Sequence, residues 1–360
     1  MFLKNDWYMA AWGAEVGTDP LSRKIVNESI VLFRDAAGKV CALEDRCCHR
    51  GVALSLGKVL PEGLQCGYHG MVFDGGGQCV LIPGQDNIPR KACVRHFAVE
   101  EKDAIVWMWL GDPAEADRSK LVDYPWHNDA KWPHREGLLH FDCNYEMLIE
   151  NIMDLTHLGY VHAKTIGGNP AAHASALMKT ERTPRGVKFA RWLLDSVPPP
   201  TYSRAVKFDG HIDRWQEEEL ITPCTIIQFT GGVDVSRGAY TGGSREGGFG
   251  MRVMHAIVPE TETTCHYFYS VANNFQTDNP AVTELVFNQV TPTLLEDKAF
   301  CESQQAIALE RHDAPFVDLK SDEARVLYRR HLTQRFEEQR QAELQKLQLR
   351  SEMAGAVTAG

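Results

Sequence analysis

The sequence contains no long hydrophobic run: none of its segments approaches the roughly 18 consecutive apolar residues that a membrane-spanning helix requires. It opens with MFLKNDWYMAAWG, which lacks the apolar stretch of a secretory signal, so we expect a cytoplasmic protein. Basic residues are also few, with 38 Lys and Arg against 48 Asp and Glu, and the net charge of −10 disfavours nucleic acid as a partner. No G-x-G-x-x-G fingerprint is present, so we predict no dinucleotide site on this chain.

What the sequence has instead is the length and composition of a two-domain globular protein. A chain of 360 residues is longer than one hydrophobic core usually supports, and 44% of its residues are hydrophobic. The first part reads as β-structure, with short runs of β-branched and aromatic residues such as Ile105–Leu110, and the polar stretch AEADRSK follows it. We therefore predict domains over residues 1–115 and 116–350, followed by a disordered tail over 351–360.

Ten cysteines are present, and in a reducing compartment they are not expected to form a disulfide framework. Two of them belong to closely spaced pairs, Cys47 with His49 in RCCHRG and Cys66 with His69 in LQCGYHGM. Flanking glycines permit tight turns, so four unrelated residues are the least favoured interpretation. A structural zinc site is an alternative, but zinc fingers usually group two cysteines together and two histidines together. The mixed pairs favour a Rieske [2Fe–2S] centre, in which two thiolates hold one iron and two imidazoles hold the other.

The stretch YEMLIENIMDLTHLGYVH, residues 145–162, is predicted to be a helix that is apolar on every side, which is typical of a buried helix. Asn151, Asp154 and His157 form a polar line on it, and buried groups of this kind need partners. His162 lies about 140° from His157 on a regular helix, so the two imidazoles meet only if the helix ends early or contains a π-bulge. If His157 binds a metal, Asp154 would accept its ring N–H and orient it. Two core histidines bonded to the backbone are the alternative.

A carboxylate on a second helix, predicted over 280–311, completes a candidate metal site. Asp297 lies on the apolar stripe of this helix, where a metal explains a carboxylate better than solvation does. The adjacent Glu296 lies about 100° away and is the solvated alternative. His157, His162 and Asp297 would form a two-histidine, one-carboxylate triad, which suits non-haem ferrous iron and leaves positions open for oxygen.

Together, the two Cys-His pairs and this helix resemble the Rieske non-haem iron oxygenases, specifically the branch that includes vanillate and dicamba O-demethylases. The resemblance extends to the opening KNDWYMAAW, the stretch IVPETETTCHYFYSVANNF and the LLEDK around Asp297. It implies an α+β fold, with an N-terminal all-β Rieske [2Fe–2S] domain and a helix-grip-like catalytic domain whose curved antiparallel sheet is flanked by helices. It also implies a homotrimer in which Asp154 bridges His157 to the cluster ligand His69 of a neighbouring subunit, while Asn151 lies close to the iron.

The same resemblance implies an enzyme, namely the oxygenase component of a multicomponent aromatic monooxygenase. Electrons from NAD(P)H would pass through a separate ferredoxin and/or flavin reductase to the cluster and then to mononuclear Fe(II), where O2 is used. The expected reaction is oxidative O-demethylation of a small methoxylated aromatic compound, with release of formaldehyde. N-dealkylation of an aromatic amide or anilide and methyl or ring hydroxylation are alternatives within the family, and a Rieske electron carrier is the alternative outside it.

Two positions match substrate contacts of the dicamba enzyme. His255 matches a histidine that binds the substrate carboxylate, and Asn288 stands where a tryptophan holds the same group. His255 is equally well interpreted as a strand histidine without this role, so the sequence leaves open whether the substrate carries a carboxylate. The pocket is expected to involve residues 163–178, 240–255 and 285–293.

Overall fold

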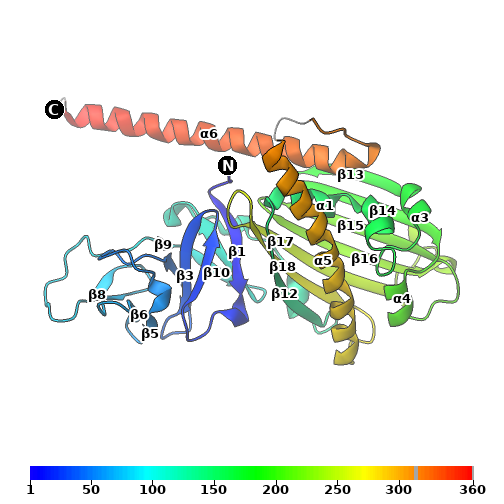
Figure 1. Cartoon of the computed structure of the whole chain (residues 1–360), viewed down its shortest axis with the longest axis horizontal. Coiled ribbons are helices and arrows are strands. Elements are labelled where there is room, and N and C mark those ends of the chain that lie inside the picture. The colour runs from blue at the N-terminus through cyan, green and yellow to red at the C-terminus, as the bar shows by residue number, and fades with distance from the viewer. Residues whose placement is uncertain (312–314, 359–360) are drawn as a thin grey trace.

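The N-terminal part of the chain consists of three antiparallel sheets, with the strand orders β1-β11-β10, β2-β3-β4-β9 and β5-β6-β7-β8 (Figure 1). The structure, a computed structural model, describes residues 1–311 and 315–358, with side chains as far as Leu349. The strand bounds are β1 Asp6–Trp12, β2 Leu21–Ile25, β3 Glu28–Arg34, β4 Val40–Glu44, β5 Lys58–Leu60, β6 Gly63–Gln65, β7 Val72–Phe73, β8 Cys79–Leu81, β9 His96–Phe97, β10 Val99–Lys102 and β11 Ile105–Leu110.

Strand β3 serves two hydrophobic cores because successive side chains of a strand point to opposite faces. Ile30 and Leu32 belong to the main core of the molecule, whereas Val31 and Phe33 belong to a small core that lies beneath the two Cys-His loops. All four side chains are fully buried. The sheet that contains β3 is therefore covered on both faces, and it attaches the small β5–β8 sheet firmly to the rest of the molecule.

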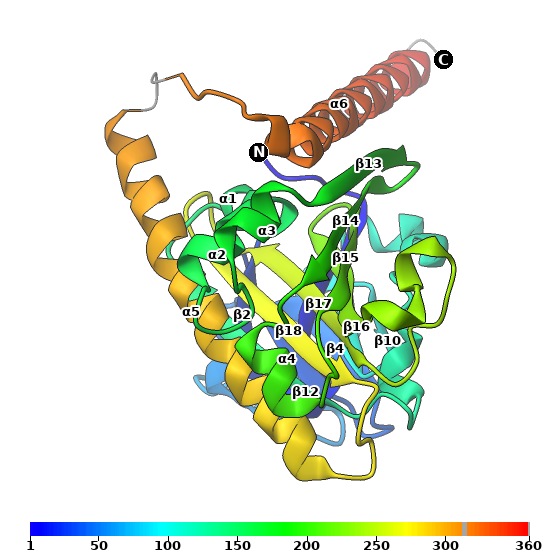
Figure 2. The ribbon, with the colours of Figure 1, turned by 90° about the vertical axis from the view of Figure 1, so that its right-hand side faces the viewer.

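The second part is built on a seven-stranded antiparallel sheet in the order β12-β18-β17-β16-β15-β14-β13. Helix α5 (Pro280–Glu310) runs along one face of this sheet and packs against β12, β18, α1 and α4 (Figures 1 and 2). This is the predicted α+β class. The other bounds are β12 His134–Phe141, β13 Leu177–Thr183, β14 Gly186–Ser196, β15 Ile212–Ile221, β16 Thr225–Asp234, β17 Phe249–Pro259, β18 Cys265–Asn273, α1 Tyr145–Met153, α2 Leu158–Val161, α3 Pro170–Ala174 and α4 Pro200–Ala205.

The main core is continuous across both parts. It joins Met9 and Trp107 of the β1-β11-β10 sheet to Phe141 and Tyr267 of the seven-stranded sheet, and each of these side chains is at most 1% exposed. The polar stretch between the two parts forms two short 3-10 turns, η3 (Pro113–Glu115) and η4 (Arg118–Lys120). The two parts therefore pack against each other as well as being joined by this connection.

Helix α6 (Glu323–Thr358) forms the C-terminal part of the described chain. Its first turns are anchored by the buried Ala324 and Tyr328, and its later turns project past the N-terminal sheets (Figure 1). The bounds of this helix include residues 351–358, and the disorder of residues 351–360 stays a prediction; residues 359–360 lie outside the described residues. Among the described helices, none combines the length and the apolar character needed to cross a membrane.

Candidate functional site

The two Cys-His pairs lie on loops with the same backbone hydrogen bonds. In each loop the cysteine N–H donates to the carbonyl five residues later, and the glycine four residues later donates back to the cysteine carbonyl, at 2.8–3.1 Å. Gly51 and Gly70 adopt φ values of 72° and 75°, which glycine reaches without steric cost. The repeated geometry places Cys47 and Cys66 in equivalent positions.

The four predicted cluster ligands lie together, and the two cysteines are buried whereas the two histidines are exposed to solvent. Cys47 and Cys66 are each 2% exposed and their thiols contact each other, whereas His49 and His69 are exposed with ring centroids 4.6 Å apart. Burial raises the pKa of Cys47 to about 11, so this thiol needs a cation to become a thiolate. A paired arrangement of two sulfurs and two imidazoles fits a [2Fe–2S] centre with mixed ligands.

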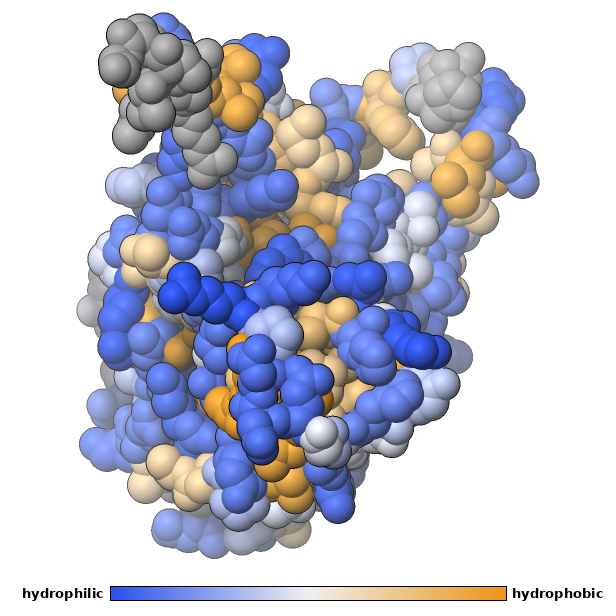
Figure 3. Space-filling model, turned by 90° about the vertical axis from the view of Figure 1, so that its left-hand side faces the viewer, coloured by the Kyte–Doolittle hydropathy of each residue, from blue (hydrophilic) through white to orange (hydrophobic). Residues whose placement is uncertain are grey.

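Apolar side chains are exposed around these histidines. Tyr68 stacks against His69 with ring centroids 3.9 Å apart, and Leu56, Val80 and Leu81 on the same small sheet and its loops are exposed as well. Figure 3 views this end of the molecule and shows apolar side chains among hydrophilic ones. Exposed apolar groups next to a redox centre indicate a contact surface.

The helix predicted over 145–162 is interrupted. Helix α1 ends just before Asp154, which adopts an extended conformation (φ −122°, ψ 93°), and a 3-10 turn then leads into α2. The interruption comes earlier than predicted because the Asp154 carboxylate caps the new turn, accepting the Thr156 N–H at 2.9 Å. The change in direction brings His157 and His162 together, with ring centroids 5.2 Å apart.

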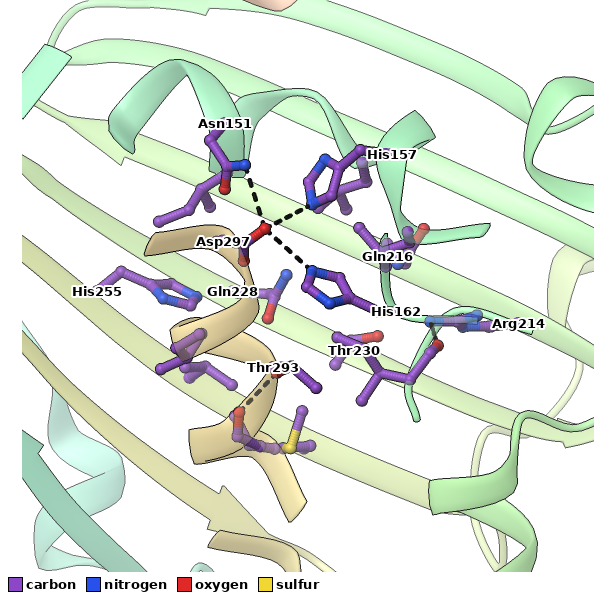
Figure 4. A pocket seen from close by; sticks show the side chains of 18 of the residues that line it. Asn151, His157, His162, Arg214, Gln216, Gln228, Thr230, His255, Thr293 and Asp297 are labelled. Atoms are coloured by element: carbon purple, nitrogen blue, oxygen red, sulfur yellow. Dashed lines mark hydrogen bonds and ion pairs between the residues drawn. The ribbon is translucent and has the colours of Figure 1, made fainter. Parts of the chain in front are cut away.

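The side chains of His157, His162 and Asp297 converge on one point (Figure 4). Asp297 Oδ1 lies 3.4 Å from His157 Nε2 and 3.1 Å from His162 Nε2. Adjacent ligands at about 2.1 Å from an octahedral ion lie about 3.0 Å apart, so this spacing fits a metal centre. Burial alone would raise the pKa of Asp297, but the two histidines lower it to about 2, which keeps it a carboxylate. The structure thus brings the predicted triad together.

Both imidazoles are oriented by bonds at their other nitrogen. His157 Nδ1 lies 2.6 Å from the carbonyl oxygen of Asp154, and His162 Nδ1 lies 2.7 Å from Glu296 Oε2. A proton on each Nδ1 leaves each Nε2 lone pair facing Asp297, as metal ligands require. Glu296, predicted to be the solvated neighbour, therefore positions His162, because the two ends of this contact are 134 residues apart and meet only in the fold.

Asp154 accepts the ring N–H of His157, as predicted, but it does so through its main-chain carbonyl and not through its carboxylate. The side-chain oxygen Oδ1 accepts from Thr156, through the main-chain N–H and through the hydroxyl at 2.7 Å, and the main-chain carbonyl of Asp154 is what faces the ring of His157. The helix interruption causes this exchange, since it turns the Asp154 side chain into a cap. Asn151 does lie close to the triad: its Nδ2 donates to Asp297 Oδ1 at 3.3 Å.

The triad lines a cavity with about 600 Å³ of atom-free space, part of which opens to solvent. Aliphatic side chains, most of them from α1, α2, β17 and α5, form part of its wall, and four of its polar side chains come from β15 and β16 (Figure 4). Each of the three predicted pocket ranges contributes at least one residue to the lining of the cavity. The apolar lining consists of Ile152, Leu155, Leu158, Ile166, Met251, Val253, Val290 and Leu294.

The two predicted substrate contacts fall in different places. His255 lines the cavity; its Nδ1 lies 2.5 Å from the Tyr267 hydroxyl, and burial lowers its pKa to about 3, so the ring is neutral. Asn288 is exposed and donates to Glu284 on the outer side of α5, so its predicted place in the pocket is wrong. Thr293, five positions further along α5, does line the cavity, and five positions correspond to about 140° around a helix, so Asn288 faces another way.

Among the lining residues that were not predicted from the sequence are four polar residues of β15 and β16: Arg214, Gln216, Gln228 and Thr230. They lie at alternate positions on β15 and β16, and all face the cavity. A signal was available in the sequence, because polar residues that recur every second position in a strand share one face. Nothing in the alternation alone shows which face of the sheet encloses a cavity.

Replacing Glu296 with glutamine is expected to weaken binding of the mononuclear metal by about 10- to 100-fold, because His162 loses the carboxylate that holds its ring. Titration of Fe(II) into protein that keeps its cluster but lacks the mononuclear metal measures the affinity, and the visible spectrum of the cluster should not change. Glu284→Gln is the matched control, since Glu284 lies on the same helix and pairs with Arg135. Equal affinities in the two variants would contradict the positioning role.

Comparisons with known proteins agree with this geometry. The family model of the vanillate O-demethylase oxygenase C-terminal domain matches residues 141–338, and that of the Rieske [2Fe–2S] domain matches residues 6–97. An iron-sulfur subunit of the toluene-4-sulfonate monooxygenase system of Comamonas testosteroni is 36% identical over 89% of this chain and 93% of its own length. A vanillate O-demethylase oxygenase subunit of Pseudomonas sp. (strain HR199 / DSM 7063) is 34% identical over 92% and 94%. The crystal structure of dicamba monooxygenase bound to 3,6-dichlorosalicylic acid has a TM-score of 0.87 and 31% identity over 95% and 99%.

Proposed function

The chain belongs to the Rieske non-haem iron oxygenases of the vanillate O-demethylase type, and from that premise we propose that it oxidatively removes the methyl group of a methoxylated aromatic compound. As a member of this family it is the oxygenase component of a multicomponent system, with a Rieske [2Fe–2S] cluster and a mononuclear iron. The products would be formaldehyde and a phenol. NAD(P)H would supply electrons through a separate ferredoxin and/or flavin reductase.

The observation that carries the proposal is the placement of the triad in the wall of a cavity that is partly lined by aliphatic side chains. When bound, iron supplies the activation of O2 with electrons from the cluster. The aliphatic walls exclude water and hold an aromatic ring, so that a methyl carbon is directed toward the triad. Asn151 holds the Asp297 carboxylate, while the Asp154 carbonyl and Glu296 keep the Nδ1 protons of His157 and His162 in place.

We also propose that the cluster of one subunit serves the iron of its neighbour in a homotrimer. The cluster loops lie beside the β5–β8 sheet at one end of the molecule. The cavity lies at the other end, between α5 and the seven-stranded sheet (Figure 1). The exposed apolar side chains around His69 favour a contact there, and Tyr160, beside the triad, is 76% exposed. The second oxygen of Asp154 has no hydrogen bond among the described residues and would accept one from the partner. A monomer in sedimentation would contradict this assembly.

Formaldehyde release tests the proposed reaction. The holoenzyme, supplied with a surrogate reductase, NADH and O2, is expected to release one formaldehyde for each phenol formed from at least one methoxybenzoate. Because the reaction is coupled to electron delivery, NADH and O2 should be consumed together with product formation. Oxidation of a ring carbon with the methoxy group retained would contradict O-demethylation.

Hydroxylation of an aryl methyl group is the second candidate. The subunit of the toluene-4-sulfonate monooxygenase system is similar over 89% of this chain, and the compound in its name carries a methyl group on the ring. The same cavity would present a methyl carbon on the ring in place of one on oxygen. Parallel assays with 4-methylbenzoate and 4-methoxybenzoate separate the two reactions, since the first yields a stable benzylic alcohol and the second yields formaldehyde.

A further inference from the structure

Two buried guanidinium groups lie side by side at one end of the cavity. Arg191 on β14 and Arg214 on β15 are 0% and 2% exposed, and the strand register places them on one face of the sheet. Arg214 lines the cavity directly, and the neighbouring Arg191 lies behind Gln216. Buried cations are costly unless an anion compensates them, so their partners decide what this end of the cavity requires.

Arg214 uses only part of its hydrogen-bonding capacity. Its Nη1 donates to the Gly167 carbonyl at 3.0 Å and its Nη2 to the Ile166 carbonyl at 2.8 Å, while its Nε–H has no partner in the described part of the chain. The guanidinium also stacks on the Tyr202 ring at 5.0 Å. These neutral contacts fix the group in position without cancelling its charge, and a guanidinium has five N–H donors to offer.

The nearby protein anions neutralise the pair only in part: Asp154 interacts electrostatically with Arg191, but no carboxylate among the described residues forms an ion pair with Arg214. Asp297 is the only carboxylate among the described residues that line the cavity, and it belongs to the triad. Glu218, on the same face of β15, is fully buried, and this burial raises its pKa to about 8, so it is mostly uncharged at neutral pH. Burial and the charge of Arg214 lower the pKa of Arg191 only to about 10, so Arg191 stays charged at neutral pH. The net charge of the protein groups at this end of the cavity is therefore positive.

Gln216 adds further donors. Arg191 Nη1 donates to Gln216 Oε1 at 3.3 Å, which leaves the amide N–H2 of Gln216 toward the cavity that it lines. A carboxylate or sulfonate matches this set, because its oxygens accept several charge-assisted hydrogen bonds at once.

His255 lies at the other end. It pairs in register with Ile226 of β16, whereas Arg214 pairs with Gly232, so the two are separated by six residues, or about 20 Å, along that strand. Figure 4 shows them on opposite sides of the triad. Since the ring of His255 is neutral, it offers no charge to an anion.

We propose that the substrate is an aromatic anion, a carboxylate or sulfonate, whose charged group binds at Arg214 and Gln216 rather than at His255. The proposal rests on the assignment of this cavity as the substrate site. It makes Arg214 a specificity-determining residue: the anion fixes one end of the ring, and the methyl carbon at the opposite end is directed toward the triad.

Binding without turnover tests the proposal. Calorimetric titrations of the holoenzyme without reductase would use 4-methoxybenzoate, 4-methoxybenzenesulfonate and the neutral 4-methoxybenzamide as probes. The wild type is expected to bind at least one of the anions more than tenfold tighter than the amide. Arg214→Gln should weaken binding of that anion by about 10- to 100-fold and leave binding of the amide within about twofold. The tighter of the two anions identifies the acid group.

The controls separate charge recognition from damage to the fold. Arg214→Lys keeps the charge and should retain part of the anion affinity. Arg252→Gln removes a guanidinium that stacks on Trp126 on the opposite face of the sheet and should leave all affinities unchanged. If Arg214→Gln does not fold, the wild-type preference and its retention in Arg214→Lys decide the matter.

An amide that binds as tightly as both anions would overturn the proposal, and so would undiminished anion binding by Arg214→Gln, which would point to direct coordination of the iron. A failure of the proposed reaction looks different: the anions bind through Arg214, but neither formaldehyde nor a benzylic alcohol is formed.

Discussion

Replacing Asp297 with alanine is expected to abolish turnover and to lower the iron content from about three to about two ions per chain, because only the cluster irons remain. Asp297 is the one carboxylate of the triad, and its Oδ1 lies 3.1 Å and 3.4 Å from the two imidazole nitrogens. Loss of a group that merely orients a ligand already weakens metal binding by about 10- to 100-fold, so loss of the ligand itself should cost more than about 100-fold. Elemental analysis and product formation measure the two effects.

The visible spectrum of the cluster should be unchanged in this variant, since the cluster loops belong to a different core from α5. Asn288→Ala is the matched control on the same helix, because Asn288 is exposed and points away from the cavity. Full activity of Asp297→Ala, or an iron content equal to that of the control, would refute the triad.

Replacing His49 with alanine is expected to remove the Rieske cluster and all reductase-dependent activity. One of the two irons would lose half of its protein ligands, and the exposed position of His49 would admit water to the site. The red-brown absorption and the EPR signal of the dithionite-reduced centre should disappear, while the mononuclear site should still take up Fe(II).

His96→Ala is a suitable control because His96 is an exposed histidine of the same domain, on β9. Its cluster spectrum and activity should match those of the wild type. An intact Rieske spectrum in His49→Ala would exclude His49 as a ligand of the cluster.

The cluster loops were the most predictable feature of the site. Each Cys-His pair lies within four residues, so the turn that brings its members together is local, and the glycine at positive φ is visible in the sequence. His157, His162 and Asp297 were predicted from burial, because polar residues in an apolar helix need partners. The class of the second domain followed from its strand-like runs and from the helix that carries Asp297.

The features that could not be predicted depend on the path of the backbone and on where side chains point, which the composition of a segment does not reveal. The interruption at Asp154 exchanged the roles of its carboxylate and carbonyl, and only the folded backbone decides between them. Glu296 was predicted to be solvated from its angular distance to Asp297 on the helix. In the fold, His162 comes from a distant segment of the chain and contacts this carboxylate. Arg214 lies on a strand whose pattern fits either face of the sheet, so its place in the cavity wall emerges only when β15 pairs with its neighbours.

The triad also links distant parts of the chain. His162 and Asp297 are 135 positions apart, and one belongs to the interrupted α1–α2 segment while the other belongs to the helix that spans the sheet. A cation held between them acts as a reversible cross-link that closes a long loop, as a disulfide does elsewhere. An ion that binds only the folded state adds about 2.7 kcal/mol to the free energy of unfolding when its free concentration is 100 times its Kd. The same ion would therefore take part in chemistry and hold α5 against the rest of the domain, so that loss of metal and loosening of the cavity become one event.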